Sequence, residues 1–366
     1  MGQWKDCRNL LVIRLDNMGD LIMNNAALQE IKHQMPSCKI TLLASKMAIP
    51  IIPYLGTIDD YIQYDAPWMK LTEQDSAAST EALIHVIKAL HFDGCLIFNV
   101  YSQNPMAAIF LAYMAGIPKR AAYMRENPYA LLTDWVPDQE PLFQVQHQII
   151  RDLGLLTHLG ISSHTNRLPT LKMPDHPCSL RLAAPLSHYI ILNYDVSEEK
   201  RRIPVEIAQE LIQKLLDLHY PVLLVGKNDN DYLAACRKNI GSRQMFNLIG
   251  KTSIPDLLSL VKGARAVITV NTGLVHMACA LKTPTLVLYA QTNPQHIPWS
   301  QESTFILYPV SAGKRSKNSI NIFVDQQHTQ AEYTPFTVDT ILEKFSELLL
   351  RFDRRETEIQ EGNQLH

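Results

Sequence analysis

The sequence predicts an α/β protein made of two tandem domains, each with a parallel sheet covered by helices on both faces. Its 366 residues exceed the ~100–200 residues of one typical domain. Short, continuously apolar runs alternate with segments of helical periodicity along most of the chain, a pattern typical of strands that are buried on both faces. A proline-rich stretch separates two such series of elements. These observations predict the fold class.

The first series begins with LLVIRL at 10–15, an apolar run that predicts a buried strand. The amphipathic segment after it predicts a helix, which Pro36 ends. The same alternation continues through the first third of the chain. We expect strands at 10–15, 39–44 and 95–100, and helices at 21–34, 81–90 and 106–114.

The pattern becomes irregular between about residues 125 and 185, where seven prolines surround one predicted helix at 143–155. Proline fixes φ and cannot donate to a strand ladder, so this density favours loops and a connection between domains. We therefore expect an N-terminal domain at 1–180 that includes this proline-rich connection. A C-terminal domain at 181–352 and a disordered charged tail at 353–366 complete the predicted organisation.

The second series repeats the alternation of strands and helices. Pro204 and Pro255 lie where a first helical turn tolerates proline, because the missing N–H would have no partner there. We expect strands at 189–193, 221–225, 266–270 and 285–289, and helices at 204–218, 229–239, 254–262, 274–281 and 338–352.

Composition and charge exclude several classes of protein. The 34 basic and 36 acidic side chains show no global basic excess, which argues against a nucleic-acid partner. The N-terminus lacks a signal-peptide pattern, and the apolar stretch 107–116 is about half of a membrane span. None of the six cysteines has C-x-x-C spacing and no H-E-x-x-H occurs, so we expect reduced thiols and no metal site. These features predict a cytoplasmic protein and leave a peripheral membrane contact open.

The segment 266–290 is the most informative part of the chain. A β-branched strand leads into Asn271, Thr272 and Gly273, and a helix of small residues follows. Asn271 suits an N-cap, and the N–H groups at such a helix start can bind a phosphate or diphosphate. Plain capping of a buried helix explains the same residues. His276, one turn further on, is either a ligand contact or a packed core histidine.

A second candidate is the turn 16–20 (Asp-Asn-Met-Gly-Asp), which follows the first strand. It lies at the carboxyl end of a strand, where doubly wound folds place their functional groups. It is no dinucleotide fingerprint, because Gly19 is its sole glycine. Asp20 can act as a general base on a hydroxyl, and Asp16 is a weaker candidate for that role. Alternatively, Asp20 simply complements the dipole of its own helix.

A third candidate is the cationic run Lys200, Arg201 and Arg202, just before Pro204. Fixed cations near a strand end suit a diphosphate leaving group, although a solvated basic loop would look the same. The Gly-Lys-Thr-Ser sequence at 250–253 imitates the end of a P-loop. It lacks the required glycine five positions earlier, so we do not expect an NTPase.

Taken together, three segments resemble glycosyltransferase family 9, the heptosyltransferases of bacterial lipopolysaccharide core assembly. The first runs from 12 to 36 (VIRLDNMGDLIMNNAALQEIKHQMP) and resembles the family's opening strand, Gly-Asp loop and helix. The second, at 91–123, resembles its middle segment with Gly-x-Pro. The third, at 247–294, resembles its most recognisable block. The likeness extends over roughly residues 9 to 300.

This resemblance implies a GT-B architecture with two Rossmann-like domains, the acceptor on the first and the nucleotide-sugar donor on the second. It implies inverting transfer without a metal ion or cofactor. By position, Asp20 matches the catalytic base, and Arg201, with Lys200 beside it, matches the lysine that holds the donor phosphates. The phosphate-binding helix start is matched by Thr272, Gly273 and His276.

The chain departs from the family pattern on the donor side. The family's usual aspartate before Thr-Gly is Asn271 here, and a glutamate that contacts the donor ribose is replaced by Asn230, with Asp229 beside it. The family's Gly-Pro-Thr-x-Pro turn has a different sequence at 290–294. Asparagine keeps hydrogen bonding but loses charge, so a donor other than ADP-heptose stays open.

The resulting hypothesis is a single displacement in which Asp20 deprotonates an acceptor hydroxyl and a nucleotide diphosphate leaves. The rivals are a catalytically degenerate nucleotide-sugar-binding protein and a nucleotide-sugar epimerase or hydrolase. On the acceptor side, Lys119, Arg120 and Arg125 form a basic group suited to the phosphates of a glycolipid. Scattered surface charge explains them equally well. The expected site of action is the cytoplasm or the cytoplasmic face of the inner membrane.

Overall fold

The computed structural model describes residues 4–70, 75–175, 188–196, 198–290, 293–308, 319–327 and 335–363. These residues divide into two compact units. The first contains Met1–Lys172 and also the short segment Pro294–His296, and the second contains Met173–Asn293 and Ile297–His366. The predicted domain boundary at 180/181 lies outside the described residues.

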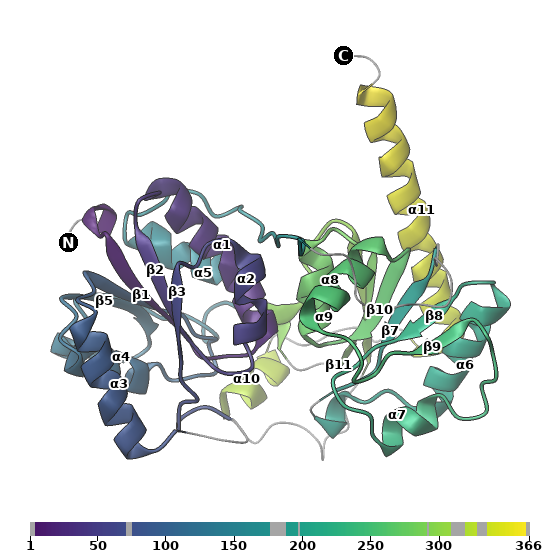
Figure 1. Ribbon diagram of the computed structural model, residues 1–366, viewed down its shortest axis with the longest axis horizontal. Coiled ribbons are helices and arrows are strands. Elements are labelled where there is room, and N and C mark those ends of the chain that lie inside the picture. Colours follow the sequence, from purple (N-terminus) through teal and green to yellow (C-terminus); the bar gives the residue numbers. More distant parts are fainter. Residues whose placement is uncertain are drawn as a thin grey trace. The chain divides into compact units, whose positions relative to one another are not determined.

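The first unit is built on a parallel sheet of six strands in the order β3-β2-β1-β4-β5-β6. The central strand β1 is almost entirely apolar and buried, as a strand covered on both faces must be. Figure 1 shows this sheet in purple and blue. The strands are β1 (Asn9–Arg14), β2 (Lys39–Ala44), β3 (Asp60–Gln63), β4 (Gly94–Ile97), β5 (Lys119–Met124) and β6 (Asp134–Pro137).

Helices cover both faces of this sheet (Figure 1). Helices α1 and α5 pack against each other, while α3 and α4 contribute buried apolar side chains to one cluster with β1 and β4. The helices are α1 (Met18–Gln34), α2 (Ile52–Leu55), α3 (Ala77–Ala89), α4 (Met106–Met114) and α5 (Gln148–His158). Short 3₁₀ turns are η1 (Trp4–Asp6), η2 (Ile49–Ile51), η3 (Tyr129–Leu131) and η5 (Pro294–His296).

The second unit has the same architecture, with a parallel six-stranded sheet in the order β12-β11-β10-β7-β8-β9. Read from β9, this is the 3-2-1-4-5-6 order of a doubly wound Rossmann sheet, and the first sheet has the same order. The strands are β7 (Ile190–Asn193), β8 (Val222–Leu224), β9 (Met245–Asn247), β10 (Ala266–Val270), β11 (Thr285–Ala290) and β12 (Ser303–Tyr308).

In the second unit, α6 and the long helix α11 pack on the sheet through one large apolar cluster. Helices α8 and α9 pack against each other beside β10 and β11. The elements are η4 (Glu199–Arg201), α6 (Val205–Asp217), α7 (Asp231–Cys236), α8 (Ile254–Gly263), α9 (Gly273–Ala280), α10 (Ser319–Gln327) and α11 (Val338–Asn363).

The predicted α/β fold with parallel sheets is confirmed, and β2, α4 and β10 have the predicted bounds. Five further strands were not predicted: β3, β5, β6, β9 and β12. Strands β3 and β9 contain no fully buried position, so they offer no continuous apolar run to find. Strand β5 begins with Lys119 and Arg120, which interrupt the apolar pattern.

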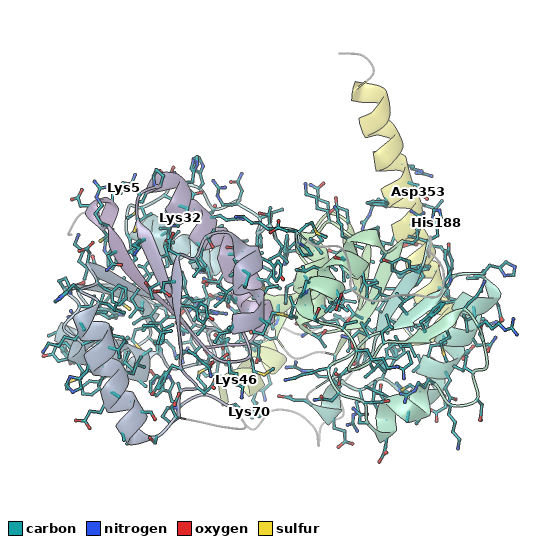
Figure 2. The ribbon with its side chains drawn as sticks, viewed as in Figure 1. Lys5, Lys32, Lys46, Lys70, His188 and Asp353 are labelled. Atoms are coloured by element: carbon teal, nitrogen blue, oxygen red, sulfur yellow. The ribbon has the colours of Figure 1, made fainter. Side chains whose placement is uncertain are left out.

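The segment predicted as a disordered tail, 353–366, differs in the structure, because α11 continues to Asn363. The sequence explains the continuation. Residues 353–361 contain neither glycine nor proline and are rich in Glu, Arg and Gln, which favour helices. Figure 2 labels Asp353 on this helix, where its carboxylate pairs with Arg265 at 2.7 Å.

Five cysteines lie in the described residues, and all five are buried free thiols: Cys7, Cys38, Cys95, Cys236 and Cys279. This agrees with the prediction of reduced core cysteines, while Cys178 lies outside the described residues. Over the described ranges, no helix combines the length and the apolar composition that a membrane span requires.

Candidate active site

Asp20 lies at the start of α1, immediately after the carboxyl end of β1. Asn17 is the N-cap of α1, and the Asp20 carboxylate accepts hydrogen bonds from the backbone N–H groups of Asn17 and of Asp20 itself. A carboxylate at the third helical position that reaches back to the N-cap is a helix-start arrangement, and the helix dipole favours its charge. Asp20 therefore complements its own helix, and the chemical role remains available to it as well.

A buried guanidinium connects the two aspartates of this turn. Arg14, the last residue of β1, is fully buried. Its Nε lies 3.1 Å from Asp16 Oδ2, and its Nη2 lies 3.3 Å from Asp20 Oδ1. A charge this deep in a protein is tolerated only when it is paired. The end of β1 thus carries one cation between two carboxylates.

Burial raises the pKa of both carboxyls, and Arg14 opposes that effect. The pKa of Asp16 is raised to about 6, and the pKa of Asp20 is raised as well. Asp16 is also held by Gln103, whose Nε2 donates to Oδ1 at 2.5 Å. A buried carboxylate whose pKa is shifted by desolvation beside a fixed charge is a typical general-base environment.

Replacing Asp16 with asparagine should flatten the dependence of stability on pH. The folded-state pKa of Asp16 is about 6, above its ordinary value of 3.8, so the folded protein binds this proton more tightly than the unfolded chain. Asp16 therefore lowers the free energy of unfolding as pH rises from about 3.8 to about 6. Urea unfolding at several pH values should show this decline in the wild type and a weaker one in D16N.

The exposed Asp60→Asn is the control for that comparison, and its pH dependence should match the wild type. Identical slopes for D16N and the wild type between pH 4 and 6 would contradict the assignment of a raised pKa to Asp16.

The second group of candidate residues lies at the carboxyl ends of strands in the second unit. Thr272, rather than the predicted Asn271, is the N-cap of α9, because Thr272 has the extended backbone that precedes the helix. Its hydroxyl does not cap the helix and instead accepts a hydrogen bond from Asn193 Nδ2 at 3.0 Å. Asn271 is buried, and Gly273 is the first residue of α9. The Thr272 side chain therefore forms no hydrogen bond with the first N–H groups of α9.

The cations of the predicted donor site belong to η4. Arg201 is half-buried, its carbonyl accepts a hydrogen bond from the Tyr308 hydroxyl at 2.6 Å, and its buried Nε has no hydrogen-bond partner within the described part of the chain. The Lys200 side chain lies outside the described residues. His276 is 3% exposed in the middle of α9, a core position.

The two residues predicted to contact the donor ribose both have hydrogen-bond partners around α7. Asn230 is the N-cap, and its side chain accepts from the Leu233 N–H at 2.9 Å. The Asp229 carboxylate forms two hydrogen bonds with Arg237, at 2.6 and 2.9 Å, and this pairing lowers its pKa. Helix capping accounts for the Asn230 side chain and an ion pair for that of Asp229, and the ribose contact stays a prediction.

The Gly-Lys-Thr-Ser sequence at 250–253 directly precedes α8. Ser253 is the N-cap, its hydroxyl accepts from the Asp256 N–H, and the Asp256 carboxylate accepts from the Ser253 N–H at 3.1 Å. This is a capping box.

The basic group predicted for acceptor phosphates is largely structural. Arg120 is buried, and its guanidinium donates to the carbonyls of Leu131, Ala130 and Ile117. Arg125 donates to the Tyr101 carbonyl at 2.7 Å, and the Lys119 ammonium lies 3.7 Å from Cys7 Sγ. The sequence left two interpretations of this basic group, an acceptor site or scattered surface charge. The buried Arg120 fits neither.

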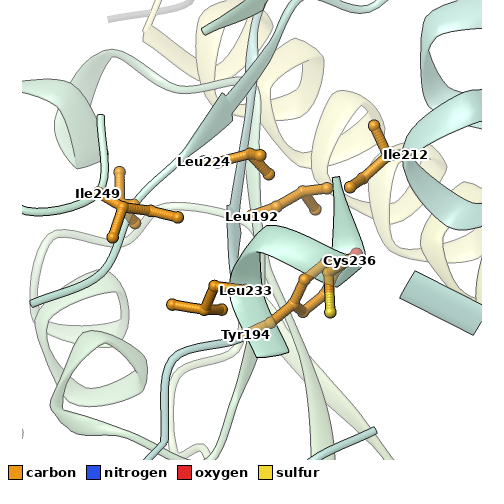
Figure 3. A pocket seen from close by; sticks show the side chains of 8 residues that line it. Leu192, Tyr194, Ile212, Leu224, Leu233, Cys236 and Ile249 are labelled. Atoms are coloured by element: carbon orange, nitrogen blue, oxygen red, sulfur yellow. The ribbon is translucent and has the colours of Figure 1, made fainter. Parts of the chain in front are cut away.

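A small cavity in the second unit lies among apolar side chains that include Leu192, Leu224 and Ile249, with Tyr194 and Cys236 beside them (Figure 3). Its volume of about 10 Å³ suits about one water molecule and is far below the ~300–1,000 Å³ of ligand pockets. A nucleotide sugar does not fit there. Within the described ranges, no three His, Cys, Asp or Glu side chains are arranged to hold a metal ion.

The partners of Asp20, Arg14 and His296, were not predicted from the sequence. The sequence does contain a signal for Arg14, because it is a charged residue at the end of an apolar run. His296, whose Nε2 lies 3.5 Å from Asp20 Oδ1, had none, because it follows β11 far along the chain. Lys32, which lies on α1 and is labelled in Figure 2, forms an ion pair with Asp59 and takes no part in this group.

Comparisons with known proteins agree with the fold. The family model of glycosyltransferase family 9 (heptosyltransferase) matches residues 82–325. The chain is 22% identical to lipooligosaccharide heptosyltransferase 2 of Haemophilus influenzae, over 94% of this chain and 100% of that protein. It is 24% identical to lipopolysaccharide heptosyltransferase 2 of Escherichia coli K12, over 79% and 84% of the two chains.

Among solved structures, the ADP-heptose lipopolysaccharide heptosyltransferase II of E. coli superposes with a TM-score of 0.71 at 20% identity, covering 94% of this chain and 99% of the other. This likeness confirms the predicted GT-B-like arrangement of two Rossmann-like sheets. Since the family model covers more than half of the sequence, the chain belongs to glycosyltransferase family 9.

Proposed function

We propose that this glycosyltransferase transfers heptose from ADP-heptose, with inversion, to a hydroxyl of a lipopolysaccharide-core-type or other glycan acceptor. The observation that carries the proposal is the buried Asp20 carboxylate at the end of β1, held by Arg14 and by the start of α1. The names of the relatives support the donor, because they are heptosyltransferases and one is described as using ADP-heptose.

The proposed reaction is a single displacement. Asp20 removes the proton of the acceptor hydroxyl while that oxygen attacks the anomeric carbon, and the nucleotide diphosphate leaves from the opposite side. The N–H groups at the start of α9, together with Lys200 and Arg201, stabilise the charge that develops on the leaving group. Thr272 and Gly273 form the helix start in this proposal.

The donor is tested by thermal unfolding of the purified protein with ADP-heptose, ADP, and GDP-, UDP- and dTDP-sugars. A ligand that binds the folded state stabilises it by about 2.7 kcal/mol at 100 times its Kd, so ADP-heptose should raise Tm. Arg201→Ala should weaken that shift. Arg202→Ala is the matched control, because Arg202 is the next cation along the chain and its guanidinium stacks on the Tyr232 ring.

The same preparation then separates transfer from the rival functions. Incubation with ADP-heptose and heptose-truncated lipooligosaccharide should add one heptose, seen by mass spectrometry. Donor binding without transfer to any acceptor would favour a degenerate binding protein, and donor consumption without acceptor would favour an epimerase or hydrolase. No Tm shift with any nucleotide sugar would contradict every version of the proposal.

Excess EDTA should leave kcat unchanged. In the proposed mechanism the diphosphate is stabilised by cationic side chains and helix N–H groups, so the reaction needs no divalent cation. Transfer from ADP-heptose is measured with EDTA, and again after Mg²⁺ or Mn²⁺ is restored. A loss of activity that either metal reverses would contradict metal-free transfer.

We further propose that the reaction takes place at the cytoplasmic face of the inner membrane, where a glycolipid acceptor would be presented. The relatives are named as heptosyltransferases of lipooligosaccharide or lipopolysaccharide, and these names support a glycolipid acceptor. Co-sedimentation of the protein with vesicles that contain truncated lipooligosaccharide tests this contact.

A further inference from the structure

The segment Pro294–His296 packs within the first unit although it follows β11 of the second. Gln295 anchors it and is fully buried. Its Oε1 accepts from the Tyr101 N–H at 3.3 Å, and its Nε2 donates to Glu140 Oε1 at 3.1 Å. A buried amide held at both ends fixes the backbone next to it, so the position of His296 is built into the first unit.

This anchoring places His296 Nε2 3.5 Å from Asp20 Oδ1. The two side chains are 19% and 14% exposed, so each is mostly buried and still reaches solvent. Hydrogen bonds of catalytic groups are often long without substrate and shorten when substrate binds. The imidazole is therefore within reach of the carboxylate oxygen that also contacts Arg14.

The charges around Asp20 explain why such a partner matters. From β1, Arg14 contacts Asp20 through Nη2, and Asp16 in the same turn contacts its Nε. From α5, the buried Asp152 attracts the Arg14 guanidinium electrostatically, and Arg151 repels it. Asp138 and Glu140 pair in turn with Arg151, so five carboxylates interact with these two guanidinium groups.

We propose that His296 is the positioning residue for Asp20 and the acceptor of the proton that Asp20 takes from the substrate. This inference rests on the proposed role of Asp20 as the base. When the acceptor oxygen bonds to the anomeric carbon and the diphosphate departs, the hydroxyl proton moves to Asp20. It then passes from the carboxyl group to neutral His296 Nε2, and the resulting imidazolium releases it to solvent. Asp20 is thereby restored as a carboxylate.

The first experiment tests the pair without any turnover. NMR titration of the histidine side chains, with the His296 signal identified by its loss in H296Q, gives the pKa of His296 in the wild type and in D20N. Because a carboxylate within ~4–6 Å favours the imidazolium, we expect this pKa to fall by about one unit in D20N. Asp93→Asn is the control, since Asp93 binds the backbone of residues 8 and 9, at the opposite end of β1.

The second experiment measures transfer from ADP-heptose to heptose-truncated lipooligosaccharide across pH. His296→Ala should lower kcat about 10–100-fold, the range for residues that orient a reactive side chain, with little change in the KM for the donor. His296→Gln can still hydrogen-bond to Asp20 through its side-chain amide, so it should recover the part of kcat that comes from positioning Asp20. It cannot titrate, so its pH profile should lack the histidine inflection of the wild type.

An unchanged His296 pKa in D20N, or wild-type kcat and pH profile in H296A, would overturn the inference. So would equal losses in H296A and H296Q with a lowered Tm and an unaltered pH profile, which indicate a merely structural role. If D20N itself transfers heptose at the wild-type rate, the proposed base fails and the relay fails with it. If D20N is inactive and H296A is normal, the relay alone fails.

Discussion

Replacing Asp20 with asparagine should lower kcat for sugar transfer about 10²–10⁴-fold, the usual contribution of a general base. Asparagine has nearly the same shape and can still face Arg14, but its amide cannot accept the proton of the acceptor hydroxyl. The Tm shift with ADP-heptose should persist, because D20N leaves unchanged Arg201 and the start of α9, which are proposed to bind the donor phosphates. The measurement is initial rate against substrate concentration, with thermal unfolding of D20N as the check on folding.

Asp16→Asn is the matched control. Asp16 lies in the same turn, is equally buried and contacts the same guanidinium, with 3.1 Å between Arg14 Nε and Asp16 Oδ2. D16N should keep most of the transfer activity, because both oxygens of the Asp16 carboxylate have partners in Arg14 and Gln103. Comparable losses in D16N and D20N would contradict the assignment of Asp20 as the base, and so would wild-type kcat in D20N.

Replacing Arg14 with methionine should lower the free energy of unfolding by about 3–5 kcal/mol, the cost of breaking a buried ion pair by removing one partner. Methionine fills much of the same volume, so the loss reports charge more than packing. The variant leaves Asp16 and Asp20 buried without their shared cation. Chemical denaturation at neutral pH measures the effect, which should shrink as the pH falls below about 6, because burial raises the pKa of Asp16 to about 6 and raises that of Asp20 as well.

Arg8→Met is the control for the removal of a positive charge near the same strand. Arg8 is exposed and donates to the Ser37 hydroxyl, so its replacement should change stability little. An R14M protein as stable as the wild type at neutral pH would mean that the buried carboxylates do not depend on this guanidinium.

The central elements of the fold could be predicted because each central strand is a continuous apolar run. Strands β2 and β10 are buried at almost every position, and their bounds follow directly from the sequence. The edge strands could not be found in this way. Strand β3 (Asp60–Gln63) is exposed at three of its four positions, so it has no continuous apolar run. What makes it a strand is pairing with β2, which no local pattern reports.

The candidate site was predictable where its residues follow a strand directly. Asp20 and Thr272 were found because a functional loop in a doubly wound fold follows the end of a strand. Local geometry decided the details that the sequence left open. Asn230 and Asp229 carry the polar groups of a ribose contact, and the structure uses both to start α7 and to pair with Arg237. His296 came together with Asp20 only through the fold.

The return of Pro294–His296 into the first unit has a consequence for dividing the protein into fragments. A fragment that ends at Lys172 would lack Gln295, and with it the side chain that joins the Tyr101 N–H to the Glu140 carboxylate. The compact first unit is therefore not one continuous piece of the sequence. A peptide that carries residues 293–297 is the natural complement to such a fragment, and its binding would restore both hydrogen bonds and the imidazole beside Asp20.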